Sequence, residues 1–427
     1  MKIAIWHNLP SGGGKRALHS QVTQLVQRGH TVEVWSPESA DATYLPLADV
    51  TVEHRLPLKV RKSRRRTFTQ RLHAVTRPAP DPLLEAVDAH SRTCAEEIRQ
   101  GDFDLVLVAP CLFYRVPRIG RFLKDLCIPV ILYLQEPRRW VYEAQPELPW
   151  IGPRESEIPT NSFLPGYWRY VLKDYFRTAE IRVDARRELE DARRYSLILV
   201  NSIFSRESIA RVYGLEARVS YLGYDAQLFL NKGMPREDFI LGLGSMDFIK
   251  GVDTAIETMA LLPVKQRLPL VWVANSGDAG YGAQMKELAD ERGVDFTVRQ
   301  RIDDQSLVDL LNRCRLLLYT SRLEPFGYAP LEATACGAPV VGIGEGGVRE
   351  IITDSVNGLL RERDPNELAA AVTELLGNPG MARSLGENGA TMAPQKFGLD
   401  IATDALIRHF ERAINVSRAP AYNGQRI

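Results

Sequence analysis

The sequence has few cysteines and no long apolar run. Its five cysteines are Cys94, Cys111, Cys127, Cys314 and Cys336. Their odd number, their wide spacing and the lack of any C-x-x-C pair indicate neither a disulfide framework nor a zinc site, and they favour a reducing, cytoplasmic compartment. The longest apolar stretch, residues 105–114, is far shorter than the roughly 20 residues that span a bilayer. We therefore expect no transmembrane helix, and the first apolar residues predict a strand instead of a signal peptide.

The sequence also has almost no net charge, because 54 lysines and arginines balance 53 acidic residues. Its strongly basic run is KVRKSRRRTFTQR, Lys59–Arg71. Such a run is either a solvated loop or a contact for an anionic partner, such as a phospholipid surface or a pyrophosphate-linked lipid. No nucleic-acid-binding module accompanies it, so we expect no nucleic acid partner. A peripheral contact with the inner membrane face through this run stays open.

Short β-branched or leucine-rich runs alternate with helical patterns along the whole chain, which is typical of α/β proteins with parallel sheets. One set of expected strands runs from KIAIW to RVSYLG and a second from ILGLG to APVVGI, with the linker-like PREDF, residues 235–239, between them. A chain of 427 residues exceeds one ordinary domain. We predict two doubly wound parallel-sheet domains at 1–230 and 236–395, then a helix at 396–415 that could pack on either domain, including back on the N-terminal one, and a tail at 416–427. Strand ends of two facing domains would border a ligand cleft.

A glycine-rich stretch, LPSGGGKRALHS, follows the first expected strand. It fails the phosphate-loop pattern G-x-x-x-x-G-K-[ST] twice, because Leu9 replaces the first glycine and Arg16 replaces the hydroxyl residue. What remains is a strand, a bend at Gly12–Gly14 and an amphipathic helix. Such a bend either offers backbone N–H groups to an anion or a sugar hydroxyl, or is a tight turn that starts the first helix.

The densest polar segment is TSRLEPFGYAPLEATACGAPVVGIGEGGVREI, residues 320–351. Glu324 lies in the loop after an expected strand, and Pro330 predicts the first position of the next helix, with Glu332 in its first turn. A carboxylate here can bind paired sugar hydroxyls, while N–H groups at a helix start can hold a diphosphate. Each acid also has a plain structural explanation, since Glu332 would favour the helix dipole and Glu324 could simply be exposed.

The segment E-P-F-G-Y-A-P-L-E, followed by A-C-G-A-P-V-V and G-G-V-R-E, resembles the signature of the family-4 retaining glycosyltransferases. The resemblance extends to VNSIFSRESIARVYG, YLGYDAQLF and LGLGSMDFIKGVD, in the family's order. It implies the GT-B fold, in which two Rossmann-like domains face a cleft. It also implies transfer of a hexose from a GDP- or UDP-linked sugar to a glycan, lipid-linked or small-molecule acceptor, without a bound metal or other cofactor. The alternative is a noncatalytic nucleotide-sugar-binding or scaffold protein of the same fold.

The resemblance also assigns roles to individual residues. Glu324 and Lys250 would be the catalytic pair, with Glu324 on hydroxyls of the donor sugar and Lys250 neutralising the diphosphate. Glu332 would bind the ribose, and Gly12 would border the acceptor. The remaining donor contacts would come from the backbone of Phe326, Gly327 and Tyr328 and from Gly13 and Gly14.

Two departures from the family pattern concern charge and proton transfer. Ser245 stands where the family has an arginine near the diphosphate, so we expect a replacement cation, with Arg322, Lys15 and Arg16 as the candidates. Gln135 stands where many relatives have a histidine, which leaves Glu136 or His7 for a proton relay. The predicted donor side therefore includes Arg322 and Ser245. The predicted acceptor side includes Gly12, Lys15, Arg16, Gln135, Glu136 and Arg138, with Arg139 and Trp140 beside them.

Two further patterns have competing explanations. Residues 342–347, GIGEGG, match a dinucleotide fingerprint, but they come late in their domain and are interpreted as the family's own glycine loop. Residues 166–182, GYWRYVLKDYFRTAEIR, place aromatic and basic side chains at helical spacing. Such a stripe is either core packing or a face that contacts an acceptor or a membrane.

Overall fold

The computed structural model describes residues 1–60, 81–152 and 165–418, and the chain forms two compact units. The first unit comprises Met1–Val200, Arg206–Arg218 and the chain from Leu406 onward. The second comprises Asn201–Ser205 and Val219–Ala405. The basic run Lys59–Arg71 falls almost entirely outside the described residues.

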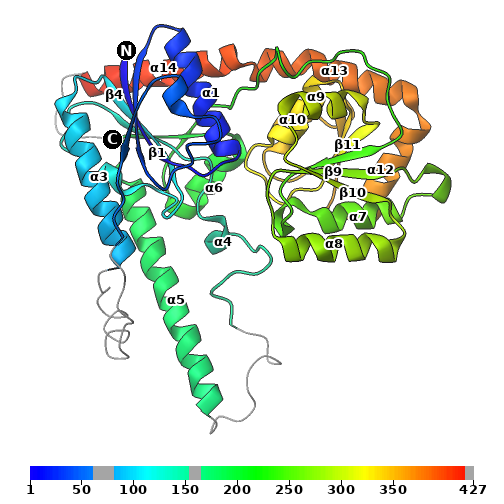
Figure 1. The fold of residues 1–427 in the computed structure, drawn as a ribbon, viewed down its shortest axis with the longest axis horizontal. Coiled ribbons are helices and arrows are strands. Elements are labelled where there is room, and N and C mark those ends of the chain that lie inside the picture. Colours follow the sequence, from blue (N-terminus) through cyan, green and yellow to red (C-terminus); the bar gives the residue numbers. More distant parts are fainter. Residues whose placement is uncertain (61–80, 153–164, 419–427) are drawn as a thin grey trace. The chain divides into compact units, whose positions relative to one another are not determined.

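The first unit is built on a seven-stranded sheet with the order β3-β2-β1-β4-β5-β6-β7 (Figure 1). Its strands are β1 (Lys2–Asn8), β2 (Thr31–Pro37), β3 (Val52–Leu56), β4 (Leu105–Cys111), β5 (Val130–Tyr133), β6 (Leu197–Val200) and β7 (Arg218–Val219). The ladders from β3 to β6 are parallel. The central strands β1 and β4 are almost fully buried, as their continuous apolar runs predict.

Helices connect these strands. They are α1 (Gly13–Gln27), α3 (Pro82–Gln100), α4 (Arg139–Tyr142), α5 (Pro165–Ala192) and α6 (Ile203–Tyr213), with 3-10 turns at Leu47–Asp49 and Arg118–Arg121. The last helix, α14 (Leu399–Arg418), follows the strands of both sheets, and it belongs to the second unit up to Ala405 and to the first unit from Leu406. The helical spacing predicts an apolar face of Leu18, Val22, Leu25 and Val26, and α1 buries the first three while Val26 is half-buried. Helix α3 begins where Asp81 accepts a hydrogen bond from the backbone N–H of Leu83.

The second unit has a six-stranded parallel sheet with the order β10-β9-β8-β11-β12-β13. Its strands are β8 (Ile240–Leu243), β9 (Leu270–Ala274), β10 (Phe296–Gln300), β11 (Leu316–Tyr319), β12 (Val340–Ile343) and β13 (Gly358–Arg361). Its helices are α7 (Val252–Ala260), α8 (Ala279–Arg292), α9 (Asp304–Arg313), α10 (Tyr328–Ala335), α11 (Val348–Ile351), α12 (Pro365–Gly377) and α13 (Pro379–Phe397), with 3-10 turns at Phe248–Lys250 and Val264–Gln266.

Both sheets contain the doubly wound strand order that is found in dinucleotide-binding folds. The order reverses between β1 and β4 in the first unit and between β8 and β11 in the second. Ligands of such sheets bind beyond the carboxyl ends of the strands at these reversals. The predicted fold class is therefore confirmed, and the topology directs attention to the segments after β1, β8 and β11.

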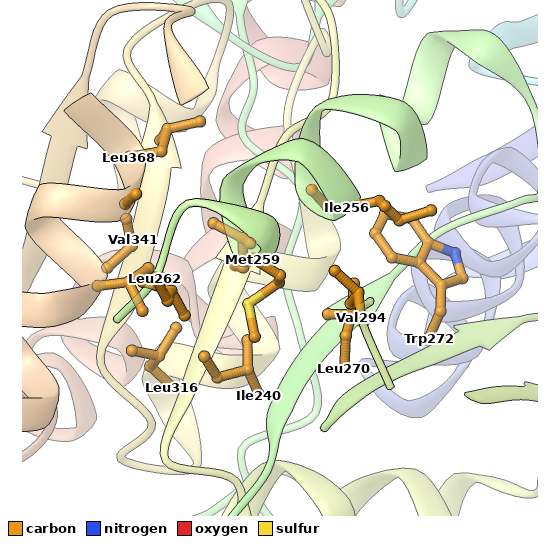
Figure 2. Packing of buried hydrophobic residues seen from close by; sticks show 14 of the residues in the cluster. Ile240, Ile256, Met259, Leu262, Leu270, Trp272, Val294, Leu316, Val341 and Leu368 are labelled. Atoms are coloured by element: carbon orange, nitrogen blue, oxygen red, sulfur yellow. The ribbon is translucent and has the colours of Figure 1, made fainter. Parts of the chain in front are cut away.

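The core of the second unit packs directly beneath one of these segments. Figure 2 shows Ile256 and Met259 of α7 among side chains of the sheet, including Trp272 of β9. A Cβ atom on Gly242 of β8 would lie 2.2 Å from the Trp272 ring, so this position has no room for a side chain. The Trp272 indole N–H donates to the carbonyl of Gly244 at 2.9 Å. The core thus holds the start of the loop that carries Lys250.

Several local expectations need correction. The sequence patterns missed β3 and β13, which are edge strands and are less apolar than the central strands. Helix α10 begins at Tyr328, two residues before Pro330, which places Glu332 beyond the first turn. The last helix reaches Arg418, whereas the prediction ended it at 415.

The linker-like residues 235–239 lie inside the second unit. The Arg236 guanidinium donates to the carbonyls of Leu311, at 2.8 Å, and of Gly337. These partly buried hydrogen bonds fix the segment to the second unit, although Pro235, Glu237 and Asp238 are exposed, and composition alone could not distinguish that from a free linker. No helix in the described part of the chain is both long and apolar enough to cross a membrane.

Candidate active site

The strongest candidate site lies after β8 and β11, where the strand order of the second sheet reverses. Lys250 and Glu324 form an ion pair there, with 2.6 Å between Nζ and Oε2. Each side chain is 23% exposed, so solvent reaches both charged groups. The two residues predicted as the catalytic pair are therefore brought together, although they are far apart in the sequence.

A short turn after β8 positions Lys250. Asp247 accepts a hydrogen bond from the Lys250 backbone N–H at 3.3 Å and starts the 3-10 turn Phe248–Lys250. Gly251 then adopts a left-handed conformation with φ of 67°, and a Cβ atom there would lie 2.3 Å from the Thr320 carbonyl oxygen. The Thr320 hydroxyl donates to the Lys250 carbonyl at 3.1 Å. Glycine is thus required for the close approach of the two loops that carry Lys250 and Glu324.

The glycine loop after β12, residues 342–347, contacts the backbone of Glu324. The backbone N–H of Gly347 donates to the Glu324 carbonyl at 2.8 Å. A Cβ atom on Gly346, whose φ is 66°, would lie 2.4 Å from the same carbonyl oxygen. Residues 342–347 therefore pack against the Glu324 loop, and α11 behind them has only four residues.

Arg363 joins the same two loops through a cluster of hydrogen bonds. Its guanidinium donates to both carboxylate oxygens of Glu345, at 3.0 and 2.8 Å, and to the carbonyls of Thr320 and Ser321, each at 3.2 Å. Burial opposes ionisation of Glu345, but the hydrogen bond and charge of Arg363 outweigh it and lower the pKa of that carboxyl. The pair fixes the chain just before Glu324.

The start of α10 presents backbone donors beside this pair. Gly327 caps the helix with φ of 109°, and the backbone N–H groups of the first turn of an α-helix point out of its N-terminus. Pro330 has no N–H to offer. Phe326 is only 3% exposed, and its ring packs against Tyr328 and Phe397. The Tyr328 hydroxyl donates to the carbonyl of Gly223 at 3.4 Å, so the donor contacts predicted for residues 326–328 would have to come from their backbone.

Glu332 differs from Glu324 in exposure. Its residue surface is only 2% exposed, while the Glu324 side chain is 23% exposed. The two glutamates of the E-x7-E segment are therefore not equivalent, because the helix start at Tyr328 carries Glu332 into the interior.

Arg322, the first candidate replacement cation, lies against the turn that carries Lys250. Its guanidinium carbon is 4.1 Å from the centroid of the Phe248 ring, and it donates to the Phe248 carbonyl at 3.2 Å and to Asp253 at 3.0 Å. Ser245, at the position of the family's arginine, hydrogen-bonds to Asp247. Arg322 thus adds a fixed cation next to Lys250, and Asp253 offsets part of its charge.

The glycine loop of the first unit starts α1. Gly12 caps the helix with φ of 133°, a conformation that favours glycine, and Gly13 and Gly14 form its first residues. A Cβ atom on Gly14 would lie 3.5 Å from Oε1 of Gln135. The structure therefore brings together the glycine loop and the residue that stands at the family's histidine position.

Lys15 requires a correction, because it is completely buried and does not offer its ammonium group to a ligand at the surface. It belongs to a charged cluster with His7 and Glu53, whose carboxylate is 3.7 Å from His7 Nε2 and accepts from Ser36 at 2.7 Å. Burial would raise the pKa of Glu53, but its contact with His7, the hydrogen bond that it accepts from Ser36 and the charge of Lys15 lower it to about 2. Burial lowers the pKa of Lys15 and that of His7. Arg16, the next residue, is half-buried.

The other predicted acceptor residues follow β5 and form ion pairs. Glu136 pairs with Arg115 at 2.7 Å, and Arg138 pairs with Glu188 at 3.3 Å. Arg139 is buried and contacts Glu143 at 2.8 Å, so it is a structural residue. These contacts fix the segment that follows Gln135.

Sequence reasoning missed the supporting residues Glu53, Asp253, Glu345 and Arg363. Arg363 and Glu345 lie on loops after strands of the same sheet, but β13 was not predicted, so nothing placed Arg363 near the site. Glu53 lies on β3, which was not predicted either, so nothing placed its carboxylate near His7 and Lys15.

Comparisons with known proteins agree with this geometry. Residues 231–392 match the family described as glycosyl transferases group 1. D-inositol 3-phosphate glycosyltransferase from Xylanimonas cellulosilytica is 32% identical over 193 residues, 44% of this chain and 45% of that protein. MMP alpha-(1->4)-mannosyltransferase from Mycolicibacterium hassiacum is 24% identical over 408 residues, 92% of each chain.

Among solved structures, HepE from Anabaena in complex with UDP superimposes with a TM-score of 0.68 at 17% identity, over 96% of this chain and 100% of that one. This likeness shows the fold. The stronger sequence match to the inositol phosphate enzyme spans less than half of that relative's length. Residues 231–392 thus match the glycosyl transferases group 1 family, and the chain has the GT-B fold.

Proposed function

We propose that the protein is a retaining glycosyltransferase that moves a hexose from a GDP- or UDP-linked sugar to an acceptor. The Lys250–Glu324 pair is the observation that carries this proposal. It lies at the strand-order reversal of the sheet inside the stretch that matches the family, where a nucleotide sugar would bind. HepE, a structural neighbour, is described with bound UDP, which supports a nucleoside diphosphate as the leaving group.

In the proposed reaction, the bond between the sugar's anomeric carbon and the diphosphate oxygen breaks, and the electron pair stays on the diphosphate. Lys250, with the N–H groups at the start of α10, stabilises that growing negative charge. Glu324 accepts hydrogen bonds from hydroxyls of the donor sugar. The acceptor oxygen attacks the same face, and its proton passes to the departing diphosphate. Positive side chains and backbone donors would thus stabilise the charge on the diphosphate in place of a metal ion, and we propose that no metal is required.

The acceptor belongs, in this proposal, to the first unit, beside Gly12–Gly14 and Gln135. A glycan or lipid-linked intermediate ranks ahead of a small molecule because of the basic run Lys59–Arg71. The buried state of Lys15 removes it from the acceptor contacts and leaves Arg16 as the cation of this loop nearest the surface.

Ligand binding tests the donor assignment. Thermal unfolding should be measured with UDP, GDP, their hexose conjugates and magnesium-ATP. A ligand at about 100 times its Kd stabilises a folded protein by about 2.7 kcal/mol, so the correct nucleotide sugar should raise the Tm by several degrees. A rise with magnesium-ATP alone would contradict the nucleotide-sugar assignment.

Substitution then separates a transferase from a noncatalytic binding protein. Glu324→Gln and Lys250→Met should each lower transfer or donor hydrolysis by about a hundredfold, because each removes a contact to the reacting groups. The matched control is the ion pair between Arg292 and Glu257, 2.9 Å apart on α8 and α7, which lies outside the loops of the site. Glu257→Gln and Arg292→Met should leave the rate unchanged, and so should EDTA. If Glu324→Gln and Lys250→Met retain full activity, the catalytic assignment to this site is wrong.

A further inference from the structure

The N-terminal half of α5 carries an exposed apolar stripe. Trp168 is 57% exposed, Val171 36%, Leu172 38% and Tyr175 54%. In Figure 1 this half of α5 extends beyond the sheet of its own unit, while the later part of the helix is anchored by buried residues such as Glu188. The core-packing interpretation of this segment is therefore wrong for these four side chains.

The four side chains share one face of the helix. Their positions follow the spacing i, i+3, i+4 and i+7, which aligns side chains along one stripe of an α-helix. A stripe of this kind on a soluble helix normally faces a core. Here it is exposed to solvent, so no part of the described chain covers it.

A row of cations borders this stripe. Arg169, Lys173 and Arg177 are spaced four residues apart, and all three are exposed. None of them takes part in an ion pair with another described residue, although Asp174 and Glu180 belong to the same segment. In the later part of the helix, by contrast, Asp184 pairs with Arg138 and Arg187. The three cations remain available to an anionic partner.

The size and composition of the stripe distinguish a membrane from a protein partner. From their exposure, the four side chains could bury roughly 400 Å² together, about half of the roughly 800 Å² per partner of a stable protein interface. Trp and Tyr are enriched at the headgroup level of bilayers, and cations near an anionic leaflet are attracted to it. We propose that the α5 stripe, Trp168, Val171, Leu172 and Tyr175, docks on an anionic phospholipid surface with Arg169, Lys173 and Arg177 at the headgroups.

This stripe belongs to a different part of the sequence from the basic run Lys59–Arg71 and does not depend on the proposed transferase function. Vesicle binding of the full chain tests it directly. Sedimentation should be compared between vesicles of phosphatidylcholine and vesicles of equal parts phosphatidylcholine and phosphatidylglycerol. Binding is expected to the anionic vesicles only.

Two multiple variants locate the contact. The variant Trp168→Ser with Tyr175→Ser, and the variant Arg169→Gln with Lys173→Gln and Arg177→Gln, should each weaken partitioning by at least about tenfold. A matched apolar control is Leu261→Ser with Val264→Ser in the second unit, where the residues are 49% and 82% exposed. A matched charge control is Arg186→Gln with Arg193→Gln, two exposed cations later in the sequence. Both controls should bind as the wild type does, and the nucleotide-induced Tm shift should be the same in all variants.

Three results would overturn the inference. One is the absence of wild-type binding to anionic vesicles. Another is unchanged binding of the two α5 variants while neutralising Lys59–Arg71 abolishes it. The third is a wild-type dimer in size-exclusion chromatography that Trp168→Ser with Tyr175→Ser converts to monomer, because the stripe would then pair with a second copy of the chain.

Discussion

At the residue scale, the site depends on a cation that is held in place by its neighbours. Lys250 faces Glu324, and Arg322 lies against the same turn, stacked on Phe248 and paired with Asp253. Ser245, where the family has an arginine, contacts Asp247 and contributes no charge. Arg322 is therefore the described cation that best fits the role of the arginine replaced by Ser245.

This arrangement predicts unequal effects of two alanine substitutions. Arg322→Ala should weaken nucleoside diphosphate binding by at least about tenfold, since a charge-assisted contact contributes about 1.5–3 kcal/mol. Ser245→Ala should change the affinity by less than about threefold. Isothermal titration with the nucleotide identified by thermal shift measures both. Small and similar effects would rule out Arg322 as the replacement cation.

At the scale of elements, loops after four different strands hold the candidate site. Gly251 permits contact between the β8 and β11 loops, Gly346 and Gly347 permit contact between the β12 and β11 loops, and Arg363 after β13 joins the last two. No single segment therefore sets the position of Glu324.

This dependence predicts that Arg363 acts as a positioning residue. Arg363→Gln removes the ion pair with Glu345 and should destabilise the protein by about 1–3 kcal/mol, because the carbonyls of Thr320 and Ser321 lose charged donors. It should also weaken nucleotide binding, while Arg363→Lys should restore part of that affinity. Thermal unfolding and titration calorimetry give the two readouts.

Arg361 provides a matched control, because it ends the same strand and pairs with the exposed Asp354 at 3.1 Å. Arg361→Gln should change the free energy of unfolding by less than about 1 kcal/mol and leave nucleotide affinity unchanged. Loss of stability without loss of affinity in Arg363→Gln would show that Arg363 supports the fold but not the site.

At the scale of the whole molecule, each compact unit has its own parallel sheet. The charged residues near the point where the strand order reverses differ between the two units. The second unit places a solvent-accessible ion pair there. The first unit buries charge beneath its glycine loop, where Lys15, His7 and Glu53 form one cluster. The two units should therefore respond differently to acid.

The buried cluster predicts acid destabilisation of the first unit. The pKa of His7 is lowered from 6.5, so the unfolded chain takes up a proton first and stability falls as the pH drops below about 6.5. The pKa of Glu53 is lowered from 4.5 to about 2, so its contribution is complete above 4.5 and is lost as the pH falls from 4.5 towards 2. Thermal unfolding between pH 8 and pH 3 should show a Tm that declines below about pH 6.5 and continues to decline below about pH 4.5, where Glu53 loses its contribution.

The variant Glu53→Gln tests the cluster itself. It removes the carboxylate with the largest favourable electrostatic effect on the buried ammonium of Lys15 and should destabilise the protein by about 3–5 kcal/mol at neutral pH, with a weaker acid dependence below pH 4.5. Glu33→Gln is the control, because Glu33 forms partly exposed pairs with Lys2 and His54 and should contribute less than about 1 kcal/mol. Equal effects of the two substitutions would contradict a special role for Glu53.

Much of the protein was determined by its sequence alone. The apolar runs of β1, β4, β8 and β11 predicted buried parallel strands because their side chains are covered on both faces. The spacing in α1 predicted its buried side, and the motifs from Gly12 to Glu350 predicted the family. These patterns involve residues that are near one another in the sequence, so they can be recognised without knowledge of the fold.

Only the tertiary structure decided which charged groups are buried and which are available. Lys15 and Glu324 both look like surface residues in the sequence, yet one is fully buried and the other faces Lys250. The stripe on α5 has the spacing of a core helix, yet it is exposed. Periodicity specifies that side chains share a face, but burial depends on what the rest of the chain places against that face, and that is set by contacts between residues distant in sequence.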